Sequence, residues 1–348
     1  MTVDITLKKE VDNSYEIVID TLPQLTFNRK VAIVTNPKVA GLHLKYLLDH
    51  LQANELYIIT VPDGEAYKNQ ASIDTIIERL FDHRFNRNSL IVAFGGGVIG
   101  DMSGFAASIY QRGIDFVQIP TTLLSQVDAS VGGKTGINNR YGKNLIGAFH
   151  QPQAVYIDPY FLTTLPAREF GAGVAEIVKM AVTFNKDFFE FLEQADLSET
   201  QTLTEVLAQA VQTKAWVVSQ DEKEKGIRAA LNYGHTFGHV IEKETQYKTY
   251  LHGEAVGIGM VMANQLALAL GWMSEQEVHR VTVLLEKYKI PTTYVIEDVD
   301  AFYEAFYLDK KSTDSAIKFI LPRGIGNVEM SDTIDEATVK RVLEGFVT

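Results

Sequence analysis

Three histidines and one glutamate in the C-terminal half of the sequence are of the types that bind divalent metals. His235 and His239 are four residues apart in NYGHTFGHVIE, so on a helix both lie on one face. His252 opens HGEAVGIGM, and Glu176 lies among apolar neighbours in AGVAEIVKMAV, where an unpaired carboxylate is costly. The chain has no cysteine, so a divalent site here would use histidine and carboxylate ligands, which zinc accepts. A pair of core histidines is the alternative interpretation.

A glycine-rich turn follows an apolar run at residues 90–94. Gly95, Gly97 and Gly100 fit the pattern G-x-G-x-x-G, with a strand-like run before them and helical spacing after them. Such a turn lets backbone N–H groups approach a pyrophosphate, and the following helix N-terminus adds a positive field. An ordinary glycine turn is the alternative for this motif alone.

Polar and glycine residues are dense after a second apolar run at residues 116–119. Lysine supplies charged donors, aspartate accepts from hydroxyls and asparagine does both, so this composition suits a phosphorylated, hydroxyl-rich ligand. The residues in question are Gln126, Asp128, Gly132, Gly133, Lys134, Thr135, Gly136, Asn138, Lys143 and Asn144.

These segments together resemble the 3-dehydroquinate synthase family. The matching motifs are GGGVIGD, the Arg112-Gly113 pair, PTTLLSQVDASVGGKTGIN, GKN, LNYGHTFGH and LHGEAV, and the resemblance covers essentially the full chain. It implies a phosphate-eliminating lyase of the shikimate pathway, which supplies aromatic amino acids. In that family NAD transiently oxidises the substrate 3-deoxy-D-arabino-heptulosonate 7-phosphate. Phosphate is then eliminated, the hydride returns, and an intramolecular aldol step gives 3-dehydroquinate.

The resemblance also implies the cofactors NAD and Zn²⁺ or Co²⁺, with the metal held by Glu176, His235 and His252 and with His239 on the substrate side. The substrate-site residues that it implies are Asp128, Lys134, Asn144, Lys179, Lys214, Glu224, Arg228, Asn232 and His239, with Arg112 from the partner of a homodimer and a lysine from Lys310 and Lys311. The NAD-site residues that it implies are Asn36, Glu65, Lys68, Gly96, Gly97, Val98, Asp101, Thr121, Thr122, Asp128, Lys134, Lys143, Asn144, Leu162, Thr164, Leu165 and Glu169.

The basic residues have a simpler interpretation when each is taken alone, as solvated surface charges. Taken together they could bind a carboxylate and a phosphate, and arginine suits bidentate contact with either group. Lys179 is three residues after Glu176 and shares its helix face. Arg228 and Asn232 share the side of His235 if that helix extends back to them.

Strand-like runs alternate with helical segments up to about residue 155, and helical spacing dominates after Pro166. This predicts an NAD-binding α/β domain over 1–155 with a parallel, Rossmann-like sheet, and a mostly α-helical metal- and substrate-binding domain over 156–348. The predicted strands are 3–8 and 15–19 as a hairpin, then 31–35, 56–61, 90–94, 116–119 and 316–321. The predicted helices are 39–54, 73–81, 166–183, 187–194, 202–220, 234–245, 254–272, 275–288 and 336–346, the last two with capping boxes at Ser274/Glu277 and Thr333/Glu336.

Composition excludes several other classes of protein. A net charge of −12 argues against nucleic-acid binding, which needs a basic surface. The lack of cysteine excludes disulfides and fits the reducing cytoplasm, and the N-terminal residues show no apolar signal region. The apolar run 255–273 is interrupted by Asn264 and Gln265, so we expect a buried helix and not a membrane span.

Three rival functions share some of these features. A metal-dependent polyol dehydrogenase of the glycerol dehydrogenase type would have a similar layout, but glycerol offers no anion for the basic cluster. A related sugar-phosphate cyclase would act on another substrate. A non-enzymatic nucleotide-binding scaffold would leave Glu176, His235 and His252 unexplained.

Overall fold

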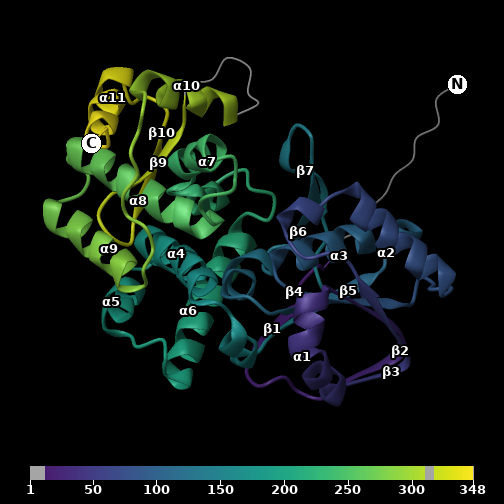
Figure 1. Cartoon of the computed structure of the whole chain (residues 1–348). Coiled ribbons are helices and arrows are strands. Elements are labelled where there is room, and N and C mark those ends of the chain that lie inside the picture. The colour runs from purple at the N-terminus through teal and green to yellow at the C-terminus, as the bar shows by residue number, and fades with distance from the viewer. Residues whose placement is uncertain (1–11, 310–316, 348) are drawn as a thin grey trace, which may run out of the picture.

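The computed structural model describes residues 12–309 and 317–347, and within them a six-stranded sheet forms the N-terminal half (Figure 1). The strand order is β1-β8-β5-β4-β2-β3, and every neighbouring pair is parallel. Long apolar runs suit such strands because helices cover both faces of the sheet. The strands are β1 (Glu16–Ile19), β2 (Leu25–Thr35), β3 (Leu51–Thr60), β4 (Leu90–Gly95), β5 (Asp115–Pro120) and β8 (Ala154–Ile157).

Three helices cover this sheet. Helix α1 (Pro37–His50) buries Leu47 with Val31 and Ile33 of β2 on one face. Helices α2 (Gln70–Asp82) and α3 (Gly97–Ile109) pack on the other face, where Ile73 and Met102 join the core. Alternate side chains of one strand therefore supply both cores, as the pleat of a strand dictates.

An antiparallel hairpin, β6 (Lys134–Asn139) and β7 (Gly142–Phe149), leaves the sheet between β5 and β8. Its tip extends toward the helical half (Figure 1). Helix α3 packs against β6 so closely that a Cβ on Gly104 would lie 2.4 Å from the Thr135 methyl carbon. Glycine at this position therefore lets the hairpin lie directly on α3.

The C-terminal half is mostly helical and surrounds α8, which is buried on every side over most of its length. This arrangement confirms the predicted fold class of a parallel α/β half followed by a helical half. The helices are α4 (Ala167–Phe184), α5 (Lys186–Gln194), α6 (Thr200–Gln220), α7 (His235–Glu244), α8 (His252–Ala269), α9 (Glu275–Lys287), α10 (Val299–Asp309) and α11 (Glu336–Glu344), with the strands β9 (Phe319–Pro322) and β10 (Val328–Ser331). No described helix is both long and apolar enough to span a membrane.

Several predicted boundaries were wrong. Residues 51–54 belong to β3 and not to the preceding helix, because Leu51 and Gln52 pair with Leu25 and Thr26. Helix α10, strand β10 and the β6–β7 hairpin were not predicted. Of the predicted N-terminal hairpin, 3–8 lies outside the described residues, and β1 pairs with β8 in parallel.

The two predicted capping boxes had different outcomes. The Ser274/Glu277 box is confirmed, with both reciprocal hydrogen bonds formed. The Thr333/Glu336 box was wrong, because Asp335 caps α11 by accepting from the Thr338 N–H at 2.9 Å. An aspartate next to the first helical residue satisfies the same free donors.

Candidate active site

Close helix packing brings the predicted metal-binding residues together from three helices. Glu176 lies on α4, His235 begins α7 and His252 begins α8. A Cβ on Gly259 of α8 would lie 2.0 Å from the Gly234 carbonyl oxygen, and one on Gly253 would lie 1.9 Å from that of Ala172. Only glycine permits these approaches, so the glycines of α8 set the spacing of the three side chains.

The donor atoms of these three residues converge. His235 Nε2 and His252 Nε2 each lie 3.9 Å from Glu176 Oε1, and one ligand atom from each residue lies within 4.8 Å of the others. Ligands about 2.0–2.1 Å from a tetrahedral zinc ion are roughly 3.4 Å apart, close to this spacing. The set therefore fits a divalent metal with a free coordination position.

The environment of Glu176 also suits a metal ligand. Its side chain is 1% exposed, and within the described residues neither carboxylate oxygen accepts a hydrogen bond, although Lys179 Nζ forms an ion pair with Oε2. Burial and the neighbouring Lys179 charge lower the pKa of His235 well below its usual value, so this imidazole is neutral. A neutral imidazole beside an ionised carboxylate is the state that binds metal.

A second acidic residue, Glu242, lies behind His252. Burial opposes protonation of His252, but its hydrogen bond to Glu242 and the charges of Glu242 and Glu176 together outweigh burial and raise the His252 pKa. His239, Glu242 and His252 form a second convergent group, and the His239 ring centroid lies 5.4 Å from that of His235. His239 therefore lies beside the proposed metal ligands His235 and His252, and its role on the substrate side remains a prediction. Glu242 was not predicted, although it follows His239 by three residues on the same helix face.

Buried cations lie next to this set, so their interpretation as solvated charges was wrong. Lys179, Lys214 and Arg228 are between 2% and 5% exposed. Lys214 Nζ donates to Asp128 Oδ1 at 2.6 Å, and Asp128 lies in a π-helical turn, η3 (Ser125–Ala129). Burial opposes ionisation of Asp128, but the charges of Lys214 and Lys179 outweigh burial and hold its pKa well below the usual value. We call Glu176, His235, His252, Lys179, Lys214, Asp128 and Arg228 the charged cluster.

The remaining predicted substrate residues form a short chain of contacts at the edge of the charged cluster. Lys134 forms an ion pair with Glu224, whose other oxygen accepts from Asn232 Nδ2 at 2.9 Å. Arg228 donates to the Gly132 carbonyl at 3.2 Å, while its buried Nε has no partner among the described residues. Arg228 and Asn232 lie on a 3-10 segment, η5 (Ile227–Asn232), and not on a backward extension of α7, because Gly234 takes a left-handed conformation before His235.

The glycine turn lies at the carboxyl end of β4, where Gly96 caps α3 and Gly97 and Val98 begin it. Thr121 and Thr122 follow the end of β5 beside the turn, and a Cβ on Gly96 would lie 3.1 Å from the Thr122 methyl carbon. This is the strand-turn-helix context that the motif requires for phosphate binding.

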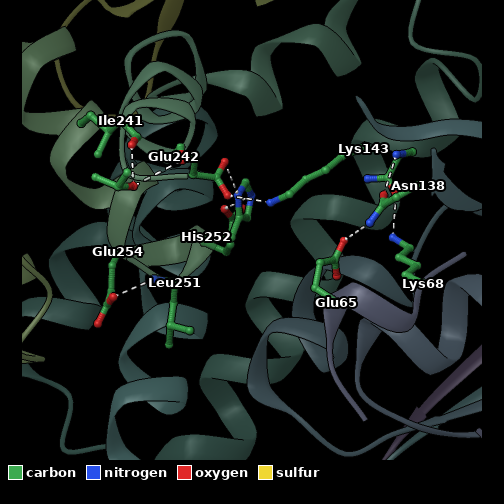
Figure 2. Close-up of polar contacts among 12 residues, drawn as sticks. Glu65, Lys68, Asn138, Lys143, Ile241, Glu242, Leu251, His252 and Glu254 are labelled. Atoms are coloured by element: carbon green, nitrogen blue, oxygen red, sulfur yellow. Dashed lines mark hydrogen bonds and ion pairs between the residues drawn. The ribbon is translucent and has the colours of Figure 1, made fainter. Parts of the chain in front are cut away.

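A polar network that includes Glu65, Lys68 and Asn138 joins the β6–β7 hairpin to the segment before α2 and to α3 (Figure 2 labels these three residues). Lys68 Nζ donates at 2.5 Å both to Asp101 Oδ2 of α3 and to Asn144 Oδ1 of β7. Glu65 accepts from Asn138 Nδ2 of β6 at 2.7 Å. The hairpin therefore ties the predicted NAD-site residues Glu65 and Lys68 to α3. The network holds Lys68 at 5% exposure.

Other predicted cofactor residues are more scattered. Asn36 caps α1 by accepting from the Val39 N–H at 2.8 Å and donates to Asp63 at 2.9 Å, so both side-chain groups have structural partners. Leu162 and Thr164 lie in the 3-10 segment η4 (Pro159–Thr164), followed by Leu165 and by Glu169 in the first turn of α4.

Arg112 is not brought into the charged cluster. Arg112 is exposed at the far end of α3, in a 3-10 turn with φ of 68°. The 13 residues of α3 place it roughly 20 Å from the glycine turn. Lys310 and Lys311 lie outside the described residues.

Comparisons with known proteins agree over the whole chain. Residues 58–172 match the family model for the 3-dehydroquinate synthase N-terminal region, and residues 173–312 match that for its C-terminal region. A 3-dehydroquinate synthase from Sulfurimonas denitrificans is 71% identical over 99% of both chains. ValA, a 2-epi-5-epi-valiolone synthase from Streptomyces hygroscopicus subsp. jinggangensis with NAD⁺ and Zn²⁺ bound, has a TM-score of 0.87 and 28% identity, covering 99% of both chains. A 2-deoxy-scyllo-inosose synthase complexed with carbaglucose-6-phosphate, NAD⁺ and Co²⁺ has a TM-score of 0.80 and 28% identity, covering 92% of this chain and 91% of that one.

Proposed function

The chain belongs to the 3-dehydroquinate synthase family, and we propose that it converts 3-deoxy-D-arabino-heptulosonate 7-phosphate into 3-dehydroquinate and phosphate. A ring hydroxyl is transiently oxidised, phosphate is eliminated, the hydride returns and an intramolecular aldol step closes the carbocycle. One observation carries the proposal: Glu176, His235 and His252 converge directly beside the buried cations of the charged cluster. A substrate with both a hydroxyl to oxidise and anionic groups fits this combination.

The proposed cofactors are NAD and a divalent metal, as bound in the solved structures of the two related cyclases. Glu176, His235 and His252 would hold the metal, which when bound would act as a Lewis acid toward a substrate hydroxyl. The glycine turn and the N-terminus of α3 would hold the NAD pyrophosphate, and NAD when bound would accept and return the hydride. Because the chain has no cysteine, we also propose a cytoplasmic location.

The side chains of the charged cluster have distinct proposed tasks. Asp128 stays ionised at neutral pH because Lys214 and Lys179 lower its pKa, so it can accept hydrogen bonds from substrate hydroxyls. Lys134 and Arg228 would pair with substrate anions, and Arg228 suits a planar carboxylate or a phosphate. His239, beside His235, would relay protons.

The proposal is distinguished from a polyol dehydrogenase by the fate of the hydride. If oxidation only prepares elimination, trace NAD supports many turnovers, and each turnover releases one phosphate. Purified protein incubated with the heptulosonate phosphate and trace NAD should release phosphate without accumulating reduced nicotinamide. A rise of reduced nicotinamide that matches product one for one would show a dehydrogenase instead.

We also propose a homodimer in which Arg112 reaches the phosphate in the partner's site. Its position supports this, because Arg112 lies at the opposite end of α3 from the glycine turn and is exposed there. A C-terminal partner for the helix dipole is the local alternative for this arginine.

A further inference from the structure

Glu242 of the helical half contacts Lys143 of the β6–β7 hairpin and so connects the two halves of the molecule (Figure 2). Its carboxylate is 4% exposed and contacts two residues from distant elements. Oε2 lies 3.3 Å from His252 Nδ1 at the start of α8, and Oε1 accepts from Lys143 Nζ at 3.0 Å, at the start of β7. A buried carboxylate is retained at low cost only where such partners neutralise it.

The contact with His252 determines how that imidazole can act. An ionised carboxylate only accepts hydrogen bonds, so the His252 proton lies on Nδ1. The Nε2 lone pair is then left facing Glu176, whose Oε1 is 3.9 Å away. The other carboxylate oxygen of Glu242 forms an ion pair with Lys143, so the carboxylate is the acceptor in both contacts.

The contact with Lys143 anchors the hairpin tip to the helical half. Lys143 also lies over the ring of Tyr247, 4.2 Å from its centroid, so two residues at the C-terminal end of α7 and just beyond it hold one lysine. Apart from this anchor, much of β7 is exposed. The same carboxylate therefore orients a proposed metal ligand and fixes the hairpin, which also carries Lys134 and Asn144.

We propose that Glu242 is a positioning residue that fixes the orientation of His252 for metal binding and, through Lys143, holds the β6–β7 hairpin against α7. This inference rests on the proposed metal-dependent function. It goes further by assigning one residue to both the metal site and the contact between the two halves.

The test uses the full-length protein and two readouts that do not depend on turnover. Titration of metal-free protein with Zn²⁺ in a calorimeter measures metal affinity, and amide hydrogen exchange over residues 134–149 measures anchoring of the hairpin. In Glu242→Gln, zinc affinity should fall by about 10–100-fold, as for other residues that orient metal ligands. Exchange in the hairpin should also become faster.

Two further variants serve as controls. Glu254→Gln removes a buried charge of α8 that pairs with Arg168, while its amide oxygen can still accept from the Leu251 N–H that caps this helix. It therefore tests for general damage to α8 and should leave both readouts unchanged. Lys143→Met should speed hairpin exchange while lowering zinc affinity less than Glu242→Gln does. Circular dichroism melts confirm that each variant is folded.

The outcomes separate the inference from the proposed function. Unchanged zinc affinity in Glu242→Gln would overturn the orientation of His252, and unchanged hairpin exchange would overturn the anchor. Equal losses in the Glu254 variant would also overturn the inference. If the unaltered protein itself bound no zinc, the proposed function would fail instead.

Discussion

The charged cluster and the glycine turn prepare for their ligands in opposite ways. In the charged cluster, ionised side chains are buried and hold one another in place, as in the ion pairs of Glu176 with Lys179 and of Asp128 with Lys214. At the glycine turn, the groups proposed to bind the NAD pyrophosphate are backbone amides, and the essential property is the absence of side chains. A single substitution should therefore damage the first region by leaving a charge or a donor unmatched, and the second by filling space.

The largest expected effect is from removing a proposed metal ligand of the charged cluster. His235→Ala should lower phosphate release at least about a thousand-fold, since a metal supplies several kcal/mol of transition-state stabilisation. Elemental analysis should show a large loss of bound metal. His279→Ala changes an exposed histidine of α9 and should leave both measurements unchanged. Full metal content in the His235 variant would remove it from the ligand set.

The next effect tests whether Arg112 of one protomer completes the active site of its partner. Mixing Arg112→Ala with His235→Ala, each nearly inactive alone, should restore activity to about a quarter of the wild-type value. Random exchange makes about half of the dimers mixed, and each mixed dimer has one intact site. Native mass spectrometry confirms the exchange. Confirmed exchange without recovered activity would show that Arg112 does not complete the partner's site.

A third effect concerns the ion pair between buried Lys214 and partly exposed Asp128. Lys214→Met should lower the free energy of unfolding by roughly 2–3 kcal/mol at pH 7, less than for a fully buried pair because Asp128 is 30% exposed. Urea titrations at several pH values measure it. Lys45→Met breaks an exposed pair with Asp49 and should change stability by less than about 1 kcal/mol.

The pH dependence of that loss gives a sharper test. In the wild type the Asp128 pKa lies below the ordinary 3.8, so its stabilising contribution is present above that pH and is lost as the pH falls through the folded-state pKa. In Lys214→Met, fewer positive charges oppose the effect of burial on Asp128, so the Asp128 pKa rises. The stability deficit should therefore be largest at neutral pH and shrink below about pH 4. A deficit independent of pH would point to lost packing alone.

The smallest effect tests the glycine turn. In Gly95→Ala the new Cβ would lie 2.7 Å from Ile99 Cγ1, so the first turn of α3 must move, at a cost of about 1–3 kcal/mol. Because this movement displaces the backbone amides of the turn, the affinity for NAD, measured by calorimetry, should also fall. Gly41→Ala in α1 meets no atom within 4 Å and should stabilise the protein by about 0.5–1 kcal/mol. Unchanged NAD affinity in Gly95→Ala would show that the turn tolerates a side chain.

Sequence patterns predicted the elements whose signal is local. The apolar runs before the glycine turn and the helical spacing of α4 to α9 correspond to observed elements, and the resemblance identified the residues that converge at Glu176. The predicted domain boundary near residue 155 and the functional assignments of single residues remain predictions. Residues 51–54 were predicted as helix because their strand character comes from pairing with β2, which a local pattern does not contain.

The burial of individual charged side chains was the main feature that local sequence patterns did not predict. Lysine and arginine are mostly exposed in proteins, so a solvated position was the natural interpretation of Lys179, Lys214 and Arg228. Their burial depends on partners such as Asp128, which lies 86 residues before Lys214. Glu242 was missed for the same reason, since its partner Lys143 is 99 residues away.

The position of β1 at the edge of the sheet has a consequence for synthesis on the ribosome. β1 pairs with β8, and the Leu22 N–H donates to Asp158, 136 residues further along the chain. At about 5–20 residues per second, the ribosome needs roughly 7–27 s to make that stretch. During this interval β1 has no edge to join, so the sheet grows from the opposite edge, where β2 pairs with β3, and β1 is the last described strand to be added. The N-terminal half therefore cannot complete its fold until β8 has left the ribosomal tunnel.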